Sequence, residues 1–300
     1  MKKFSLYVVI GLLCSCLGVR AEKKTGSCGT NLTWTLDNET MALTISGTGT
    51  MKEFENLSPW DEYCESNSTF PKSLTIEDGV TGISRYAFQY CQEVSDLYIP
   101  KSLTNISQGA FARSDFQSII VAEDNPVYDS RENCNAIIHT ATNTLHIGST
   151  STVIPSSVTA IGSQSFMACG NLVSLDIPQT VTSMGDNVFP DCWNLSSIVI
   201  PEGVTKIGSM MFYNCTALKS ATIPEGVTSI AESAFANCSS LASITIPKSV
   251  TNLGNSIFEG CIKLSEIWML PTTPPSFSKS TVFVPSNTKI IVPAASYDAY

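Results

Sequence analysis

The sequence predicts an elongated, β-rich α/β solenoid made of stacked 23-residue rungs, and three repeated positions carry this prediction. Seven phenylalanines recur at intervals of 23 residues, with a single interval of 55 residues. A cysteine lies three residues after six of them, and a proline recurs at the same spacing. The phenylalanines are Phe88, Phe111, Phe166, Phe189, Phe212, Phe235 and Phe258. Such a stack is expected to act through a repetitive surface rather than through a pocket.

Each rung is predicted to contain three short elements. Alternating apolar residues predict a strand of a parallel main sheet, which the proline ends because it has no N–H to donate to the ladder. A second apolar pair predicts a short second strand, and the phenylalanine and cysteine predict a single helical turn with its apolar side inward. In one rung these positions are Leu241, Ile244 and Ile246, then Val250 and Leu253, then Phe258 and Cys261.

Different patterns flank the repeats and predict caps that cover the ends of the stack. Alternating apolar residues on both sides of Asp37–Thr40 predict a β-hairpin at the N-terminal end. Lys289 to Val292 predicts a final strand, and Pro293 a short helix after it. The expected organisation is a signal peptide (1–21), an N-terminal β cap (22–73), the repeat array (74–270) and a C-terminal cap (271–300).

The 55-residue interval holds one rung and an insertion at about residues 122–152. Ala136 to Thr140 and Thr144 to Ile147 predict a hairpin that protrudes from one rung. A two-residue turn would place His139 opposite His146, near enough to share a metal ion or to respond to pH. Because long insertions into repeats often lie on a binding face, the hairpin is a candidate contact site.

The rung sequence resembles the BspA-like leucine-rich repeat family of bacterial and protozoan surface proteins, whose units read I-P-x-x-V-T-x-I-G-x-x-A-F-x-x-C-x-x-L-x-S. The resemblance covers about residues 74 to 270, and the segments at 125–138 and around Cys28 and Trp34 also resemble parts of that family. It implies a leucine-rich repeat fold and extracellular adhesion to host proteins or other cells. It carries over no catalytic residue.

Chemistry at a single site has little support in the sequence. Two histidines are too few for a zinc site, and a third ligand from Asp129 or Cys134 has no supporting spacing, so two solvated histidines are expected. Glu123 and Asp124 lack the spacing of a calcium loop and read as an acidic surface loop. There is no serine–histidine motif, P-loop or dinucleotide fingerprint. We therefore expect no enzyme activity, no metal and no cofactor.

Charge and the N-terminal residues indicate export. The formal net charge is −9, which disfavours nucleic acid and anionic membranes as partners because both are bound through clustered Lys and Arg. Lys2 and Lys3 precede a short apolar run, which predicts a signal peptide cleaved after Ala21. Lipidation at Cys16 is the alternative, since a loose lipobox precedes it. No other segment is long and apolar enough to span a membrane.

After cleavage nine cysteines remain, an odd number that cannot all pair within one chain. Those of the regular rungs occupy one repeat position, so we expect buried free thiols, although the rung spacing also permits disulfides between neighbours. Cys28 and Cys64 both lie in the N-terminal cap and form the leading disulfide candidate.

The strand register fixes which side chains face outward on the main sheet. The central column is Thr75, Tyr98, Ile120, Val153, Asp176, Val199, Thr222, Thr245 and Trp268. The flanking column includes Ser118, Ser174, Ser197, Ser220, Ser243 and Glu266. Tyr98 and Trp268 are the leading contact candidates, because aromatic residues are the commonest energetic anchors of interfaces. Their alternative roles are to cover the sheet and to pack on the C-terminal cap.

The expected function is therefore a secreted or cell-surface adhesion module that binds an extracellular protein or another cell. The central column and the histidines of the hairpin are the candidate contacts. The alternative is a structural or accessory envelope protein, in a surface layer or a glycan-handling assembly, whose solenoid spaces other components.

Overall fold

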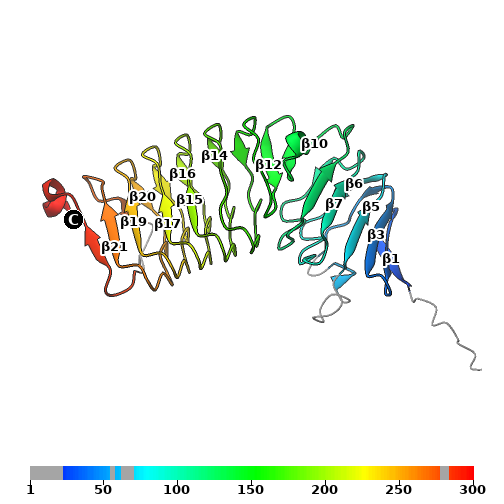
Figure 1. Cartoon of the computed structure of the whole chain (residues 1–300), viewed down its shortest axis with the longest axis horizontal. Coiled ribbons are helices and arrows are strands. Elements are labelled where there is room, and N and C mark those ends of the chain that lie inside the picture. Colours follow the sequence, from blue (N-terminus) through cyan, green and yellow to red (C-terminus); the bar gives the residue numbers. More distant parts are fainter. Residues whose placement is uncertain (1–22, 55–57, 62–70, 278–283) are drawn as a thin grey trace, which may run out of the picture.

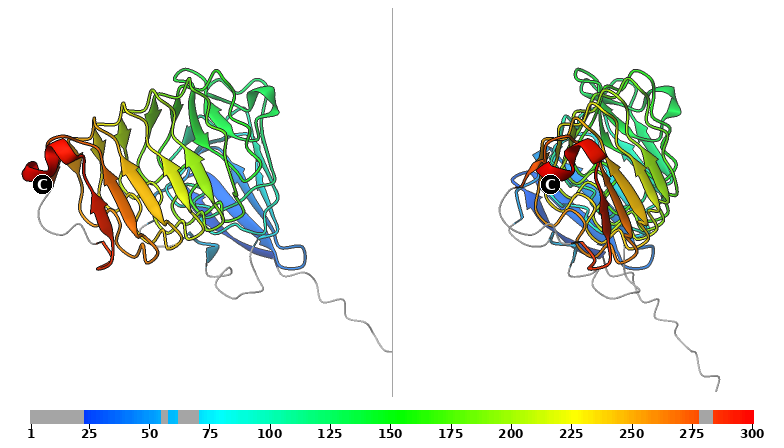
Figure 2. Two further views of the ribbon diagram at one scale, coloured as in Figure 1. Left: turned by 60° about the vertical axis from the view of Figure 1, so that its left-hand side comes forward. Right: turned by 90° about the vertical axis from the view of Figure 1, so that its left-hand side faces the viewer.

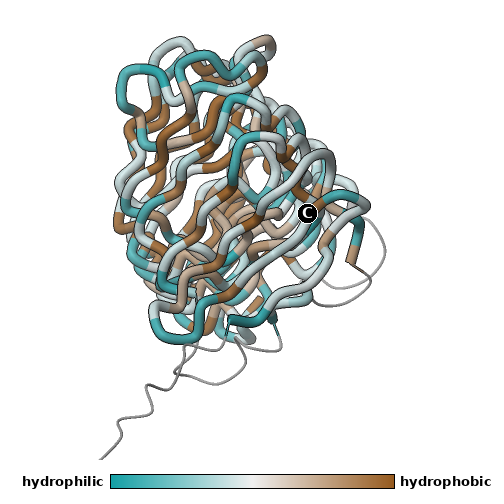
Figure 3. The backbone as a smooth tube through the Cα atoms, turned by 90° about the vertical axis from the view of Figure 1, so that its right-hand side faces the viewer, coloured by the Kyte–Doolittle hydropathy of each residue, from teal (hydrophilic) through white to brown (hydrophobic). Residues whose placement is uncertain are grey.

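The computed structural model describes residues 23–54, 58–61, 71–277 and 284–300. Within these residues the chain winds through stacked rungs along one long axis (Figure 1). Viewed along that axis, the rungs superimpose around a common centre (Figure 2), and apolar stretches recur at the same place from one turn to the next (Figure 3). The predicted solenoid, with a parallel main sheet and short second strands, is confirmed.

The main face consists of one strand per rung, and most neighbours pair in parallel, in register. The strands form four hydrogen-bonded groups rather than one continuous sheet. The groups are β1 (Lys23–Gly29), β2 (Leu32–Asp37), β3 (Ala42–Gly47) and β5 (Ser73–Ile76); β7 (Asp96–Ile99) and β9 (Ser118–Val121); β15 (Ser197–Val199) and β17 (Ser220–Thr222); and β19 (Ser243–Ile246), β21 (Glu266–Met269) and β23 (Lys289–Ile291).

The second face carries the short strands expected after each proline corner, together with the insertion. Its first and last groups are β4 (Gly49–Thr50), β6 (Val80–Ile83) and β8 (Asn105–Ile106), and β16 (Lys206–Ile207), β18 (Ser229–Ile230), β20 (Asn252–Leu253) and β22 (Ser276–Phe277). The middle group is β10 (Tyr128–Asp129), β11 (Ile137–His139), β12 (Thr144–Ile147), β13 (Ala160–Ile161) and β14 (Ser183–Met184). A short 3₁₀ helix, η2 (Arg131–Asn133), lies between β10 and β11.

The third side of each regular rung differs from the predicted helical turn. It is a succession of tight turns, in which the cysteine N–H bonds to the phenylalanine carbonyl, as Cys261 does to Phe258 at 3.1 Å. Residues two before and two after the phenylalanine have left-handed φ angles, such as 54° at Asn187 and 60° at Asp191. A helix cannot continue through such residues, so the predicted helical turn is wrong in this detail.

The phenylalanines form stacked columns in the core, and the cysteines lie buried beside them. From Phe166 to Phe258, neighbouring ring centroids are 5.2 to 6.0 Å apart. Cys28 and the cysteines of the regular rungs from Cys169 to Cys261 are free and buried, which confirms the predicted thiol stack. Cys28 is one of these free thiols, so the predicted Cys28–Cys64 disulfide is wrong; Cys64 itself lies outside the described residues.

Both ends of the stack carry the expected secondary structure. At the N-terminus β2 and β3 form the predicted hairpin, β1 adds a third antiparallel strand, and β3 pairs in parallel with β5. Trp60 stacks on Phe88 with ring centroids 5.4 Å apart, so the aromatic column begins one turn before the first repeated phenylalanine. At the C-terminus β23 pairs with β21, and η3 (Ala294–Ala299) follows Pro293.

The insertion lies inside the stack, and the prediction of a protruding hairpin is wrong. The β11–β12 hairpin does form, but β12 pairs in parallel with β13 and so continues the second face. Along β11 the side chains alternate between two cores: Ile137 packs with the N-terminal core, whereas Ala136 and Ile138 pack with the C-terminal core. We call this strand the septum, and the boundary between the two cores the seam.

Polar side chains connect the rungs across the seam where regular strand pairing is interrupted. On the main face, Asn135 Oδ1 accepts from the N–H of Ile119, and Ser130 Oγ accepts from the N–H of Val121 at 3.1 Å. On the turn side, Arg113 forms an ion pair with Asp191 at 2.9 Å. The rungs before the seam are tilted relative to those after it (Figure 1).

Candidate binding surfaces

The central column lies on the surface as the register predicts. All nine of its side chains are exposed, from Thr75 to Trp268. Neighbouring members face each other across paired strands, as Tyr98 does with Ile120, and Thr245 with Trp268. Of the flanking column, the serines from Ser174 to Ser243 are exposed, while Ser118 and Glu266 are partly covered. The main face therefore exposes hydroxyl, aliphatic and aromatic side chains, with the carboxylate of Asp176 among them.

The two aromatic candidates occupy different positions on this face. Tyr98 is 54% exposed and borders a groove of ≈ 430 Å³ whose lining also includes Lys72, Asp96 and Ile120. Trp268 is 42% exposed, and in the strand register it is the partner of Ile291 in the last strand, β23. Trp268 therefore retains a large exposed surface although the C-terminal elements follow it.

The main face is irregular in the middle of the central column. Val153 and Asp176 lie in segments without assigned strand structure, between β9 and β15. Both residues line a groove of ≈ 310 Å³. Val153 is 72% exposed, so an apolar side chain projects beside this hollow.

The two histidines do not face each other, which corrects the predicted hairpin geometry. A register shift in β11–β12 pairs His139 with Thr144, while Ile137 pairs with Ile147. The loop joining the strands is longer than the two residues assumed, and this changes the cross-strand partner. Both imidazole rings instead contact the ring of Tyr128, at centroid distances of 5.8 and 5.9 Å.

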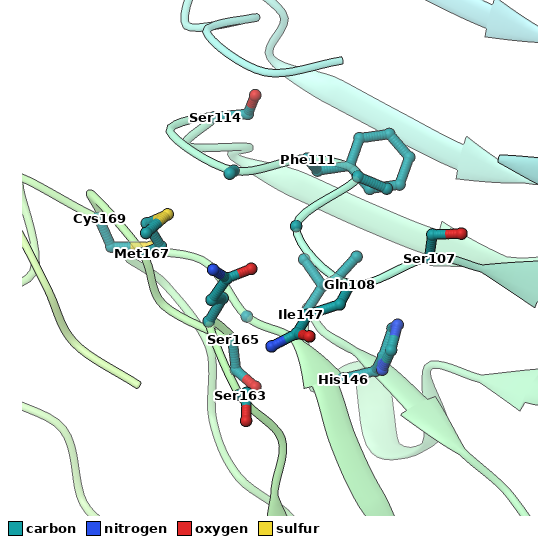
Figure 4. A pocket seen from close by; sticks show the side chains of 15 residues that line it. Ser107, Gln108, Phe111, Ser114, His146, Ile147, Ser163, Ser165, Met167 and Cys169 are labelled. Atoms are coloured by element: carbon teal, nitrogen blue, oxygen red, sulfur yellow. The ribbon is translucent and has the colours of Figure 1, made fainter. Parts of the chain in front are cut away.

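His146 is turned inward at the seam. Its Nε2 lies 3.0 Å from the carbonyl oxygen of Ile106, so a neutral ring donates a hydrogen bond there. Burial lowers the pKa of His146 below its usual value of 6.5; the bond to Ile106 opposes this shift, and the nearby His139 adds to it. His146 also lines a seam cavity of ≈ 20 Å³, with Gln108 on one side and Ser163, Ser165 and Cys169 on the other (Figure 4).

Asp129, an acidic residue of the insertion, has a structural partner. Asp129 accepts two charge-assisted bonds from Arg131, at 2.8 and 2.6 Å, and Arg131 also reaches Asn143. Among the residues that the structure describes, no three His, Cys, Asp or Glu side chains are grouped as metal ligands would be. Burial raises the pKa of Cys134 to about 11, which disfavours the thiolate that a metal would bind.

Trp193 and Tyr90 are two further exposed aromatic residues that the repeat pattern did not single out. Trp193 follows Cys192 at a position occupied by Thr216 and Ser239 in later rungs, and it is 44% exposed. It lies on the turn edge rather than on the main face. Other rungs place Gly170 and Ile262 at the same position, so the repeat has no consistent polar pattern there that would have marked Trp193 in the sequence.

The chain matches the family described as BspA type leucine rich repeat region, in six copies over residues 51–137 and 144–265. Among curated proteins, none is similar enough in sequence to be matched. In the described part of the chain, no helix has the length and apolar character needed to cross a membrane.

Several solved bacterial structures share the fold. A leucine-rich repeat protein from Eubacterium ventriosum is 21% identical, with 92% of this chain and 94% of that chain covered and a TM-score of 0.52. A leucine rich cell surface protein from Faecalibacterium prausnitzii is 20% identical, with 92% and 97% covered and a TM-score of 0.54. The pneumococcal vaccine antigen PcpA is 14% identical, with 93% and 95% covered and a TM-score of 0.62.

Proposed function

Because this chain belongs to the BspA-type leucine-rich repeat family, we propose that it is an exported protein-binding module that adheres to a host matrix protein or to another cell. The row of exposed aliphatic and aromatic side chains on the main face supports this role. Contiguous apolar groups that a fold leaves in water mark interaction surfaces. The contact set we propose is the central column: Tyr98, Ile120, Val153, Asp176, Val199, Thr222, Thr245 and Trp268, together with Thr75.

The insertion contributes fewer residues to the proposed contact set than its sequence suggests. His146 is bonded to the backbone inside the seam, so we remove it from the contact set, and His139 remains only as a partly exposed neighbour. The similarity to bacterial surface proteins supports an extracellular location. Cleavage after Ala21 and lipidation at Cys16 fall outside the described residues. Mass spectrometry of the N-terminal peptide of the exported protein would distinguish cleavage after Ala21 from lipidation at Cys16.

The test is capture of partners from extracellular extracts by the exported form. The double variant Tyr98→Ala with Trp268→Ala is expected to weaken binding of the captured partner at least about tenfold, because buried aromatic anchors carry much of the energy of an interface. Ile262→Ala is the matched control, since Ile262 is an equally apolar exposed residue away from the main face.

Two outcomes would contradict the proposal. Equal binding by the double variant and the unmodified protein would remove the central column as the site. Capture of no partner at all would favour the structural or accessory envelope role instead.

A further inference from the structure

A polar groove crosses the seam on the side where the main strands begin. It has a volume of ≈ 410 Å³, and we call it the seam groove. Its walls come from three successive turns of the solenoid, namely the last rung before the insertion, the insertion itself and the first rung after it. The lining residues are Asp115, Phe116, Gln117, Thr150, Ser151 and Asn171.

The floor of the seam groove is held in place by a carboxylate with several donors. Asp115 accepts hydrogen bonds from the backbone N–H of Thr150 at 3.1 Å and from its hydroxyl at 2.5 Å. Asn171 Nδ2 donates to the same carboxylate at 3.4 Å. These donors fix the orientation of the Asp115 carboxylate.

A second hollow lies on the main face, along two of the same turns. The hollow beside Val153 and Asp176 is lined by residues 152–154 and 174–178, which directly follow Ser151 and lie just beyond Asn171 in the chain. The two hollows therefore run along the same pair of turns. Each has a volume in the range of about 300 to 1,000 Å³ that is typical of ligand clefts.

An aromatic ring lies near the seam groove, against the residue that precedes Asn171. The indole of Trp193 lies against Gly170 of the preceding rung. A Cβ added to Gly170 would lie only 2.9 Å from the indole Cε3. Gly170 directly precedes Asn171, which lines the seam groove. A larger residue at position 170 would displace the indole, so glycine there permits this position.

The lining chemistry selects the class of ligand. No Lys, Arg or His lines either hollow, so neither is suited to an anionic ligand. The exposed groups are the amides of Gln117 and Asn171 and the hydroxyl of Ser151, which both donate and accept hydrogen bonds. Together with the apolar face of the Trp193 indole, they match a ligand with hydroxyls on its edges and C–H groups on its faces.

We propose that the seam groove, with Trp193 near Asn171, binds an uncharged oligosaccharide. The seam groove itself contains no residue of the central column, so its test does not depend on the proposed protein-binding function; only the neighbouring hollow includes two of those residues, Val153 and Asp176. Asn171 and Gln117 would hydrogen-bond the sugar hydroxyls while the indole stacks on a sugar ring. The fixed carboxylate of Asp115 would keep Thr150 and Asn171 in position.

The experiment is a titration of the exported protein with neutral tetra- to hexasaccharides of glucose, mannose, xylose and N-acetylglucosamine, followed by saturation-transfer NMR and calorimetry. At least one oligosaccharide is expected to bind, and Trp193→Ala and Asn171→Ala are each expected to weaken it at least about tenfold. Trp268→Ala is the matched control, because it removes an exposed indole of similar exposure from the main face. Circular dichroism of each variant verifies the fold.

Three results would overturn the proposal. In the first, no neutral oligosaccharide binds at millimolar concentration. In the second, binding is lost in Trp268→Ala and retained in Trp193→Ala. In the third, unglycosylated peptides from a library bind at the seam groove and the oligosaccharides do not. That result would assign the groove to a protein segment.

Discussion

Single residues tie one rung to the next through the cysteine column. The Sγ atoms of Cys192, Cys215 and Cys238 lie 3.1 to 3.2 Å from the carbonyl oxygens of phenylalanines one rung earlier. Burial raises the pKa of these thiols, so they remain protonated donors and are poor nucleophiles. The repeated cysteine is thus a structural hydrogen-bond donor.

His146 makes stability depend on pH. Its pKa is lowered in the folded state, so above pH 6.5 the ring is neutral in both folded and unfolded chains and its contribution to stability is fully present. As pH falls below 6.5 the unfolded chain binds a proton that the folded chain excludes. The free energy of unfolding is therefore expected to decrease from pH 6.5 toward the lowered pKa of the folded state, as measured by urea denaturation at a series of pH values.

The control for this prediction is His146→Gln, whose side-chain amide retains a donor for the carbonyl of Ile106 but does not titrate. Its stability should be less sensitive to pH between 6.5 and 5 than that of the unmodified protein. His139 and Tyr128 are the titratable groups packed nearest to His146. Parallel pH profiles for the two proteins would assign the dependence to other groups.

At the scale of elements, the insertion replaces an aromatic residue in the core with bare backbone. Gly148 donates its N–H to the carbonyl of Ser165 at 2.8 Å, and its Cα faces the ring of Phe166. A Cβ at this position would meet the ring Cε1 at 2.2 Å. Only glycine allows the insertion and the next rung to pack this closely.

The substitution Gly148→Ala is therefore expected to destabilise the protein by about 1 to 3 kcal/mol, the usual cost of overpacking a core. Guanidinium denaturation followed by circular dichroism measures this cost. Gly226→Ala is the matched control, because its nearest neighbour is 3.1 Å from the added Cβ and a smaller loss is expected there. A larger loss at Gly226 than at Gly148 would contradict the assignment.

The position of the insertion shows where sequence patterns stop being informative. The two strands of the hairpin were predicted, but Ala136, Ile137 and Ile138 are all apolar and do not alternate with polar residues. Such a run is typical of a strand buried on both faces, and this signal favours the septum over an exposed hairpin. β1 was missed because Lys23–Gly29 contains no apolar alternation at all.

The turn segments show a different limit. Their left-handed positions are filled by residues as unlike as Tyr86, Gln164, Met210 and Ser256. Because tertiary stacking imposes this conformation on many residue types, the sequence alone cannot distinguish these turns from one turn of helix. The seam groove was also beyond prediction, since Asp115, Thr150 and Asn171 meet only through the path of the insertion.

On the scale of the whole molecule, the septum divides the hydrophobic interior into two cores. One contains buried residues from Cys28 to Ile137, and the other from Cys134 to Met269. The periodic phenylalanines and most of the central column were predictable because they follow the 23-residue register, from which only the steps around Ile120 and the insertion depart. The division was not, because it depends on which way the side chains of one strand point.

Separate cores predict separate responses to core mutations. Phe212→Ala and Phe88→Ala each remove a fully buried ring that stacks on its neighbours, at a cost of about 3 to 5 kcal/mol. In native-state hydrogen exchange, Phe212→Ala is expected to reduce protection mainly on the C-terminal side of the septum, and Phe88→Ala mainly on the N-terminal side. Uniform loss of protection along the chain in both variants would show that the two cores unfold as one unit.

The septum also has a mechanical consequence for a protein held at both ends. Tension applied along the long axis would peel rungs from an end in succession, since each rung is bonded mainly to its neighbours. Peeling that begins at the C-terminal end would meet a boundary at β11, because that strand contributes Ile137 to the core on its far side. The N-terminal rungs would then remain folded as an anchor while the released rungs lengthen the tether.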